Sequence, residues 1–168
     1  MRKENNYKLI NTKTELLKYD PSKKKDLMRR GLKDIELQKR ILVVAAQDNI
    51  GELLSYILSK EGYSISIVES WGVFEEVLSE LKNEQYNMVL LTNNSLRPHH
   101  IQSLVSEIKG LYPSLCVFVL SGYKEKDFIV NLKQQGIDEF LSMPFKSDHL
   151  VSKIKSIFSN KSSRLKDK

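Results

Sequence analysis

The stretch RILVVAAQ, residues 40–47, decides the fold of this chain. Its first half, Ile41–Val44, is a short unbroken apolar run rich in β-branched residues. Such a run is typical of a central strand in a parallel sheet whose two faces are covered by helices. The run ends at Ala45 and Ala46, and in doubly wound folds the binding chemistry lies just beyond the carboxyl ends of such strands. Ala45 and Ala46 form one side of this corner at the carboxyl end of the strand, and they offer neither a charge nor a nucleophile.

Beyond this strand, strand-like and helix-like segments alternate five times. The expected strands lie at 41–44, 63–67, 88–91, 116–120 and 140–141. Apolar residues at helical spacing follow them at 50–57, 74–81, 101–108, 128–132 and 150–158. Alternating units with short connections predict an α/β domain, a doubly wound five-stranded parallel sheet with helices on both faces.

The net charge of +6 is unevenly distributed over the 168 residues. Residues 1–40 carry a balance of +7, residues 41–160 a balance of −4, and residues 161–168 a balance of +3. These shifts predict a basic, helical N-terminal extension over 1–39, a domain over 40–159 and a basic flexible tail over 160–168. The chain shows neither an apolar signal core nor a run of about 20 apolar residues, so we expect a cytoplasmic protein.

The N-terminal extension has an amphipathic segment. Asp20 followed by Pro21 is a helix start signal, and a helix from Ser22 to about Gln38 is expected. Its basic face carries Lys25, Arg29, Arg30 and Lys33. Such a face is most often solvated, but it is also compatible with nucleic acid or another polyanion. The extension lacks a recognition-helix motif and an aromatic stacking platform.

Residues 40–159 resemble a response regulator receiver domain of the chemotaxis-regulator type. The resemblance rests on five segments and their order: RILVV, GELLSYILSKEGY, YNMVLL, FVLSGY and QQGIDEFLSMPF. It implies a flavodoxin-like sheet in the order 2-1-3-4-5 and a cis bond before Pro144. It also implies the site of a family that accepts a phosphoryl group on aspartate beside a Mg²⁺ ion.

Most site positions of this sequence depart from the family's pattern. Ala45 and Ala46 stand at the acidic pair, Thr92 at the phosphoacceptor, and Met143 at the lysine before the proline, whereas Ser121 keeps its hydroxyl. Without these carboxylates a Mg²⁺ ion loses its main ligands. We therefore expect no aspartyl phosphorylation, no metal, no cofactor and no enzymatic activity.

Three features have a structural interpretation beside a functional one. Thr92 is expected to be a strand-end hydroxyl bonded to backbone rather than a phosphosite. The resemblance implies that Phe140 moves with Ser121 as a switch, but a packed strand aromatic needs no such role. The pair His99 and His100 is interpreted as an exposed loop rather than a zinc site, because adjacent histidines point in different directions.

The sequence thus indicates a degenerate receiver, a pseudo-receiver that acts as a phosphorylation-independent protein-interaction module in two-component or phosphorelay signalling. By resemblance, its partner surface is the fourth helix, fifth strand and fifth helix. The candidate contacts are Lys124, Lys126, Lys133, Phe140 and Lys153. The alternative is an adaptor whose basic N-terminal helix binds nucleic acid or another polyanion. The sequence leaves the oligomeric state open.

Overall fold

The computed structural model describes residues 38–45, 49–69, 74–93 and 97–164. The chain divides into two units, 1–37 and 38–168. The expected N-terminal helix and its basic face (Lys25, Arg29, Arg30 and Lys33) lie outside the described residues, as does Ala46. The described residues all belong to the second unit.

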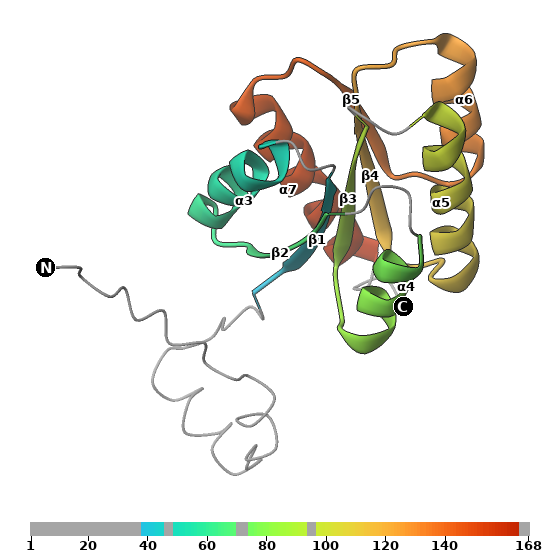
Figure 1. Cartoon of the computed structure of the whole chain (residues 1–168). Coiled ribbons are helices and arrows are strands. Elements are labelled where there is room, and N and C mark those ends of the chain that lie inside the picture. The colour runs from blue at the N-terminus through green and yellow to red at the C-terminus, as the bar shows by residue number, and fades with distance from the viewer. Residues whose placement is uncertain (1–37, 46–48, 70–73, 94–96, 165–168) are drawn as a thin grey trace, which may run out of the picture. The chain divides into compact units, whose positions relative to one another are not determined.

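Five parallel strands form one sheet in the order β2-β1-β3-β4-β5 (Figure 1). The strands are β1 (Arg40–Ala45), β2 (Ser64–Glu69), β3 (Met88–Asn93), β4 (Cys116–Ser121) and β5 (Glu139–Ser142). This order confirms the predicted flavodoxin-like topology. Each strand extends one or two residues beyond the end of the predicted apolar run. In β3 and β4, the polar residues Thr92 and Ser121 continue the hydrogen-bonded pairing at the carboxyl ends of the strands.

Five helices cover the sheet. They are α3 (Ile50–Lys60), α4 (Phe74–Asn83), α5 (Pro98–Leu111), α6 (Lys126–Gln134) and α7 (Ser147–Arg164). Helices α3 and α7 lie on one face, and α4, α5 and α6 lie on the other (Figure 1). Both faces of the central strands are therefore removed from water, which explains why their sequences are apolar without alternation.

The sheet separates two apolar cores. The core under α4, α5 and α6 takes Leu42, Val44, Val89, Leu91, Val117 and Val119 from the strands. The core under α3 and α7 takes Ile41, Val43, Ala45, Met88, Leu90, Cys116, Phe118 and Leu120. Cys116 is fully buried, and burial raises the pKa of its thiol. Successive strand residues thus alternate between the two cores.

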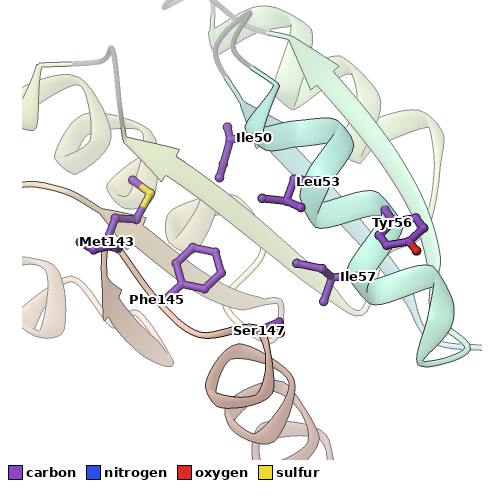
Figure 2. Close-up of a pocket in the computed structure, with 8 residues that line it drawn as sticks. Ile50, Leu53, Tyr56, Ile57, Met143, Phe145 and Ser147 are labelled. Atoms are coloured by element: carbon purple, nitrogen blue, oxygen red, sulfur yellow. The ribbon is translucent and has the colours of Figure 1, made fainter.

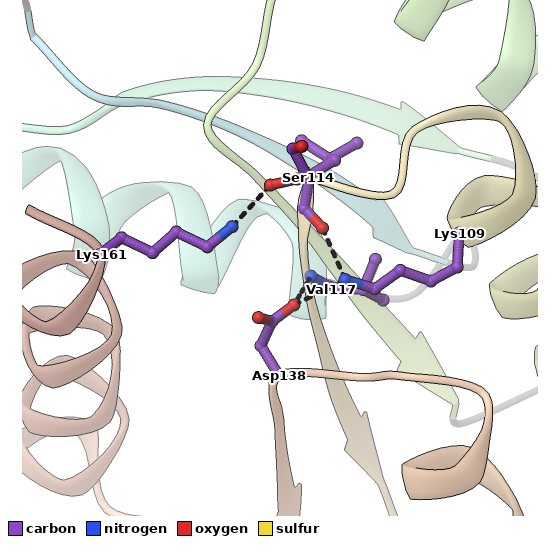
Figure 3. Close-up of polar contacts among 6 residues, drawn as sticks. Lys109, Ser114, Val117, Asp138 and Lys161 are labelled. Atoms are coloured by element: carbon purple, nitrogen blue, oxygen red, sulfur yellow. Dashed lines mark hydrogen bonds and ion pairs between the residues drawn. The ribbon is translucent and has the colours of Figure 1, made fainter. Parts of the chain in front are cut away.

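Helix α7 continues to Arg164, so residues 160–164 of the predicted flexible tail are helical. The reason is tertiary contact that the polar sequence does not reveal. Phe158 packs on Tyr63 with ring centroids 5.6 Å apart, and the Lys161 ammonium donates to the Ser114 carbonyl at 2.5 Å (Figure 3). Residues 165–168 lie outside the described part of the chain.

Polar contacts tie strands together at the amino edge of the sheet. Asp138 accepts the backbone N–H of Val117 at 2.8 Å and pairs with Lys109 at 2.9 Å (Figure 3). The Lys109 ammonium also donates to the Leu115 carbonyl at 2.8 Å. One carboxylate before β5 is therefore bonded directly to β4 and to the last turn of α5.

A second contact group surrounds the start of β1. The Arg40 guanidinium lies over the Tyr86 ring, 4.9 Å from its centroid, and pairs with Glu84 at 3.0 Å. The Tyr86 hydroxyl donates to the Glu80 carboxylate. Burial, together with this hydrogen bond, raises the pKa of Tyr86 to about 12.

Candidate functional site at the carboxyl ends of the strands

Ala45, at the end of β1, is packed into the core. Its side chain is 1% exposed and belongs to the core under α3 and α7. Helix α3 approaches closely at Gly51, where an added Cβ would lie 3.2 Å from the Ala45 Cβ and 3.3 Å from the Ile67 Cγ2. The first position of the family's acidic pair is therefore occupied by close apolar packing.

Thr92, at the phosphoacceptor position, is held by the neighbouring strand. It is 2% exposed, and its hydroxyl donates to the Val44 carbonyl at 3.2 Å. This backbone bond is the arrangement that the sequence predicts for Thr92. A hydroxyl whose proton is shared with a carbonyl is not activated as a nucleophile by that contact, because activation requires a base or a lowered pKa.

Ser121 and Met143 meet through the backbone. Ser121 is fully buried, and its hydroxyl accepts the N–H of Tyr123 at 3.0 Å. Its carbonyl accepts the N–H of Met143 at 2.8 Å, which fixes the β5–α7 loop against the end of β4. The bond between Met143 and Pro144 is cis, as the resemblance implies. Met143, at the family's lysine position, is thus held in place by the backbone, but its side chain is an uncharged thioether.

Phe140 packs against the core under α4, α5 and α6. Its ring lies edge-on to Phe128 at 6.4 Å, and Phe128 lies edge-on to Tyr123 at 5.2 Å. Tyr123 in turn donates its backbone N–H to Ser121. The expected switch pair is therefore linked through two intervening aromatic residues, and the packed position of Phe140 agrees with its structural interpretation.

These residues do not fit a Mg²⁺ ion. Ala45, Thr92 and Met143 supply no carboxylate, and Mg²⁺ in proteins is bound through one or two carboxylates and water. Within the described ranges, no group of three or more His, Cys, Asp or Glu side chains could hold a metal ion.

The two adjacent histidines lie in the first turn of α5, not in a loop as the sequence predicts. Pro98 occupies the first helical position and starts the helix before them. The His99 and His100 rings are 4.2 Å apart, and His100 lies edge-on to Phe74 at 6.5 Å.

Some of the residues expected to contact a partner are exposed to solvent, and others make contacts within the domain. Lys124, Lys126 and Lys133 are exposed on and before α6. Lys153 instead pairs with Glu139 at 2.9 Å, so its charge is partly neutralised. Phe140 is partly buried, with its side chain packed against the core under α4, α5 and α6.

An apolar groove beside the corner is a feature that sequence reasoning missed. It has a volume of about 680 Å³ and lies between α3 and the β5–α7 loop (Figure 2). Its lining is Ile50, Leu53, Tyr56, Ile57, Met143, Pro144, Phe145 and Ser147. The sequence held only part of the signal: α3 carries apolar residues over a wider arc than one buried face requires, but nothing in this pattern points to the second wall of the groove.

Comparison with known proteins identifies the fold and the family. The family model of the response regulator receiver domain matches residues 41–155. The chain belongs to this family. It is thus a receiver domain of a two-component signalling protein, and the scaffold around its altered corner is the receiver scaffold. In the part of the chain that the structure describes, no helix is long and apolar enough to cross a membrane.

A curated relative is much longer than this chain. It is 30% identical over 114 residues to the DNA-binding transcriptional regulator NtrC of Proteus hauseri, which covers 68% of this chain and 23% of that protein. The receiver therefore spans about a quarter of the length of this curated relative.

Two solved structures resemble the receiver. A CheY-like receiver domain protein from Methanospirillum hungatei JF-1 has 25% identity and a TM-score of 0.68, over 76% of this chain and 98% of that one. NtrX from Brucella abortus, solved with ADP, has 26% identity and a TM-score of 0.64, over 78% of this chain and 28% of that one.

Proposed function

We propose that this receiver is a protein-interaction module that works without phosphorylation and has no enzymatic activity of its own. The observation that carries the proposal is the corner at the carboxyl ends of β1, β3 and β5. There, Ala45 is buried in the core, Thr92 is bonded to backbone, and Met143 replaces a cation. The scaffold persists around a corner that does not support phosphoryl transfer.

The chemistry of phosphoryl transfer explains why three changes matter together. An acceptor carboxylate must attack the donor, a divalent cation must be bound beside it, and a cation must stabilise the charge on the phosphoryl oxygens. Thr92 offers a hydroxyl that already donates a hydrogen bond, and neither Ala45 nor Met143 can supply charge. Restoring one of these groups would leave the other two requirements unmet.

A signalling role then rests on binding. The exposed lysines Lys124, Lys126 and Lys133 surround α6 on the surface that the family resemblance assigns to partners. Their charge is positive, so we expect a partner with an acidic contact surface. Because the corner does not respond to a phosphoryl donor, the affinity of this contact should be constant, and the fraction of receiver bound should depend only on the partner's concentration.

The test is affinity capture with the full chain, in the presence and absence of acetyl phosphate and Mg²⁺. We expect the same captured protein, in the same amount, in both conditions, and no phosphoryl adduct by intact mass. A triple variant with Lys124, Lys126 and Lys133 changed to Glu should lose the capture, whereas the matched variant Lys82→Glu on α4 should keep it. A donor-dependent change in capture, or a phosphoryl adduct, would contradict the proposal.

A further inference from the structure

The outer side of α3 carries an apolar patch beside the groove. Leu53 is 49% exposed and Tyr56 is 61% exposed, and these residues lie one helical turn apart. Ile50 and Ile57 border them on the side that faces Met143 and Phe145 (Figure 2). Large apolar side chains that are left exposed together, rather than singly, are typical of a surface that another chain covers.

We propose that a second copy of this chain covers the patch, with α3 of each copy lying antiparallel to α3 of the other about a two-fold axis at Tyr56. This inference does not depend on the proposal that the site at the carboxyl ends of β1, β3 and β5 works without phosphorylation. A two-fold contact requires a surface that fits itself. The α3 surface offers the projecting Leu53 and Tyr56 together with the apolar groove that these two residues help to line.

The charges on α3 favour this occupant and this orientation. Glu52 and Lys60 are exposed and lie four residues before and four residues after Tyr56. An antiparallel pair with its axis at Tyr56 therefore brings Glu52 of each copy opposite Lys60 of the other, twice in one contact. A parallel pair would place like charges together, which is unfavourable. The Lys60 ammonium lies 4.1 Å from the Tyr56 ring centroid, so this charge borders the apolar patch.

One competing surface is α6, where Val130 is 42% exposed. Asp127 and Lys133 lie three residues before and after Val130, so charge alone would allow an antiparallel pair there as well. The apolar surface decides between the two helices. Val130 is the single large apolar side chain exposed on α6, whereas α3 exposes two and adjoins the apolar groove. Val130 therefore serves as the matched control.

The test is sedimentation equilibrium of the full 168-residue chain across the micromolar range. We expect a reversible monomer–dimer equilibrium. Tyr56→Glu should weaken dimerisation by at least about tenfold, because it places two charges at the centre of the contact. Val130→Glu, which changes another exposed apolar residue in the same way, should leave dimerisation unchanged. Circular dichroism should show that both variants keep the helix content of the unchanged chain.

Charge reversal decides whether the occupant is a second copy in this orientation. E52K and K60E should each weaken dimerisation by about threefold to tenfold at low salt, because each places like charges opposite each other. An equimolar mixture of the two variants should restore association as a heterodimer, because both facing pairs then place a lysine of one copy opposite a glutamate of the other, whereas in a dimer of either variant alone both pairs carry like charges. A chain that stays monomeric, a dimer weakened by Val130→Glu but not by Tyr56→Glu, or a mixture that associates no better than either variant alone would each overturn the proposal.

Discussion

Replacing Ala45 with aspartate returns a carboxylate to the corner at the end of β1. The side chain at this position is 1% exposed and packs where α3 approaches at Gly51. Added volume in such a site costs about 1–3 kcal/mol of the free energy of unfolding. An ionised carboxylate without a partner costs about 3–5 kcal/mol. We therefore expect Ala45→Asp to lose both contributions at pH 8, about 4–8 kcal/mol together, which is comparable to a typical domain's whole stability.

The loss should depend on pH with a definite sign. Burial disfavours the charged form, so the folded-state pKa of the introduced carboxyl is raised above its unfolded-state value. Below the unfolded-state pKa, the carboxyl is neutral in both states and only the volume cost remains. As the pH rises toward the folded-state pKa, the unfolded chain ionises first and stability falls by about 1.4 kcal/mol per pH unit.

The measurement is urea unfolding of the unchanged chain, Ala45→Asp and Ala45→Asn at pH 5 and pH 8, with and without Mg²⁺. Ala45→Asn controls for volume and should lose about 1–3 kcal/mol at both pH values. Mg²⁺ should not stabilise Ala45→Asp more than Ala45→Asn, because Thr92 and Met143 bring no further charge. An Ala45→Asp variant as stable as the unchanged chain at pH 8, or one that Mg²⁺ selectively stabilises, would refute the reasoning.

Two further outcomes depend on polar contacts at the amino edge of the sheet. Asp138→Ala should lower the free energy of unfolding by about 1–3 kcal/mol, because it removes the acceptor of the Val117 N–H and the ion pair of Lys109, which keeps only its hydrogen bond to the Leu115 carbonyl. In urea titrations, the exposed control Asp127→Ala should change the free energy of unfolding little. The pKa of Tyr86, raised to about 12, favours the neutral phenol in the folded state, so its contribution is complete below pH 10 and is lost as the pH rises through 12. Unfolding measured between pH 9 and 12 should show this loss, and Tyr86→Phe should lack it; equal pH dependence in both chains would exclude Tyr86 as its source.

The fold was predictable because its signals are local. The unbroken run Ile41–Val44 indicated a buried parallel strand, and the helical spacing after it indicated the alternation. The backbone bond of Thr92 was predictable for the same reason, since a threonine hydroxyl at a strand end has backbone acceptors nearby. The end of α7 was not, because its last turns depend on Lys161 reaching a carbonyl at Ser114, far away in sequence.

The groove was not predictable from sequence because it joins two distant segments. Helix α3 forms one wall of the groove, and the loop at Met143 and Phe145 forms the other wall, about ninety residues further along the chain. Periodicity assigns Leu53 to the apolar side of α3 together with Leu54, but only Leu54 is buried. Which of two adjacent leucines faces the core is decided by the close approach of α3 at Gly51, a tertiary property.

The most direct test of the proposal that this receiver works without phosphorylation is amide NMR of the full chain. The chain is titrated with Mg²⁺ and beryllofluoride, and the beryllofluoride mimics the phosphoryl group. We predict no saturable shift at Thr92, Ser121 or Met143, because the described residues Ala45, Thr92 and Met143 supply no carboxylate to accept the phosphoryl mimic or to bind the cation. Specific, saturable shifts at these three residues would contradict the proposal that the receiver works without phosphorylation.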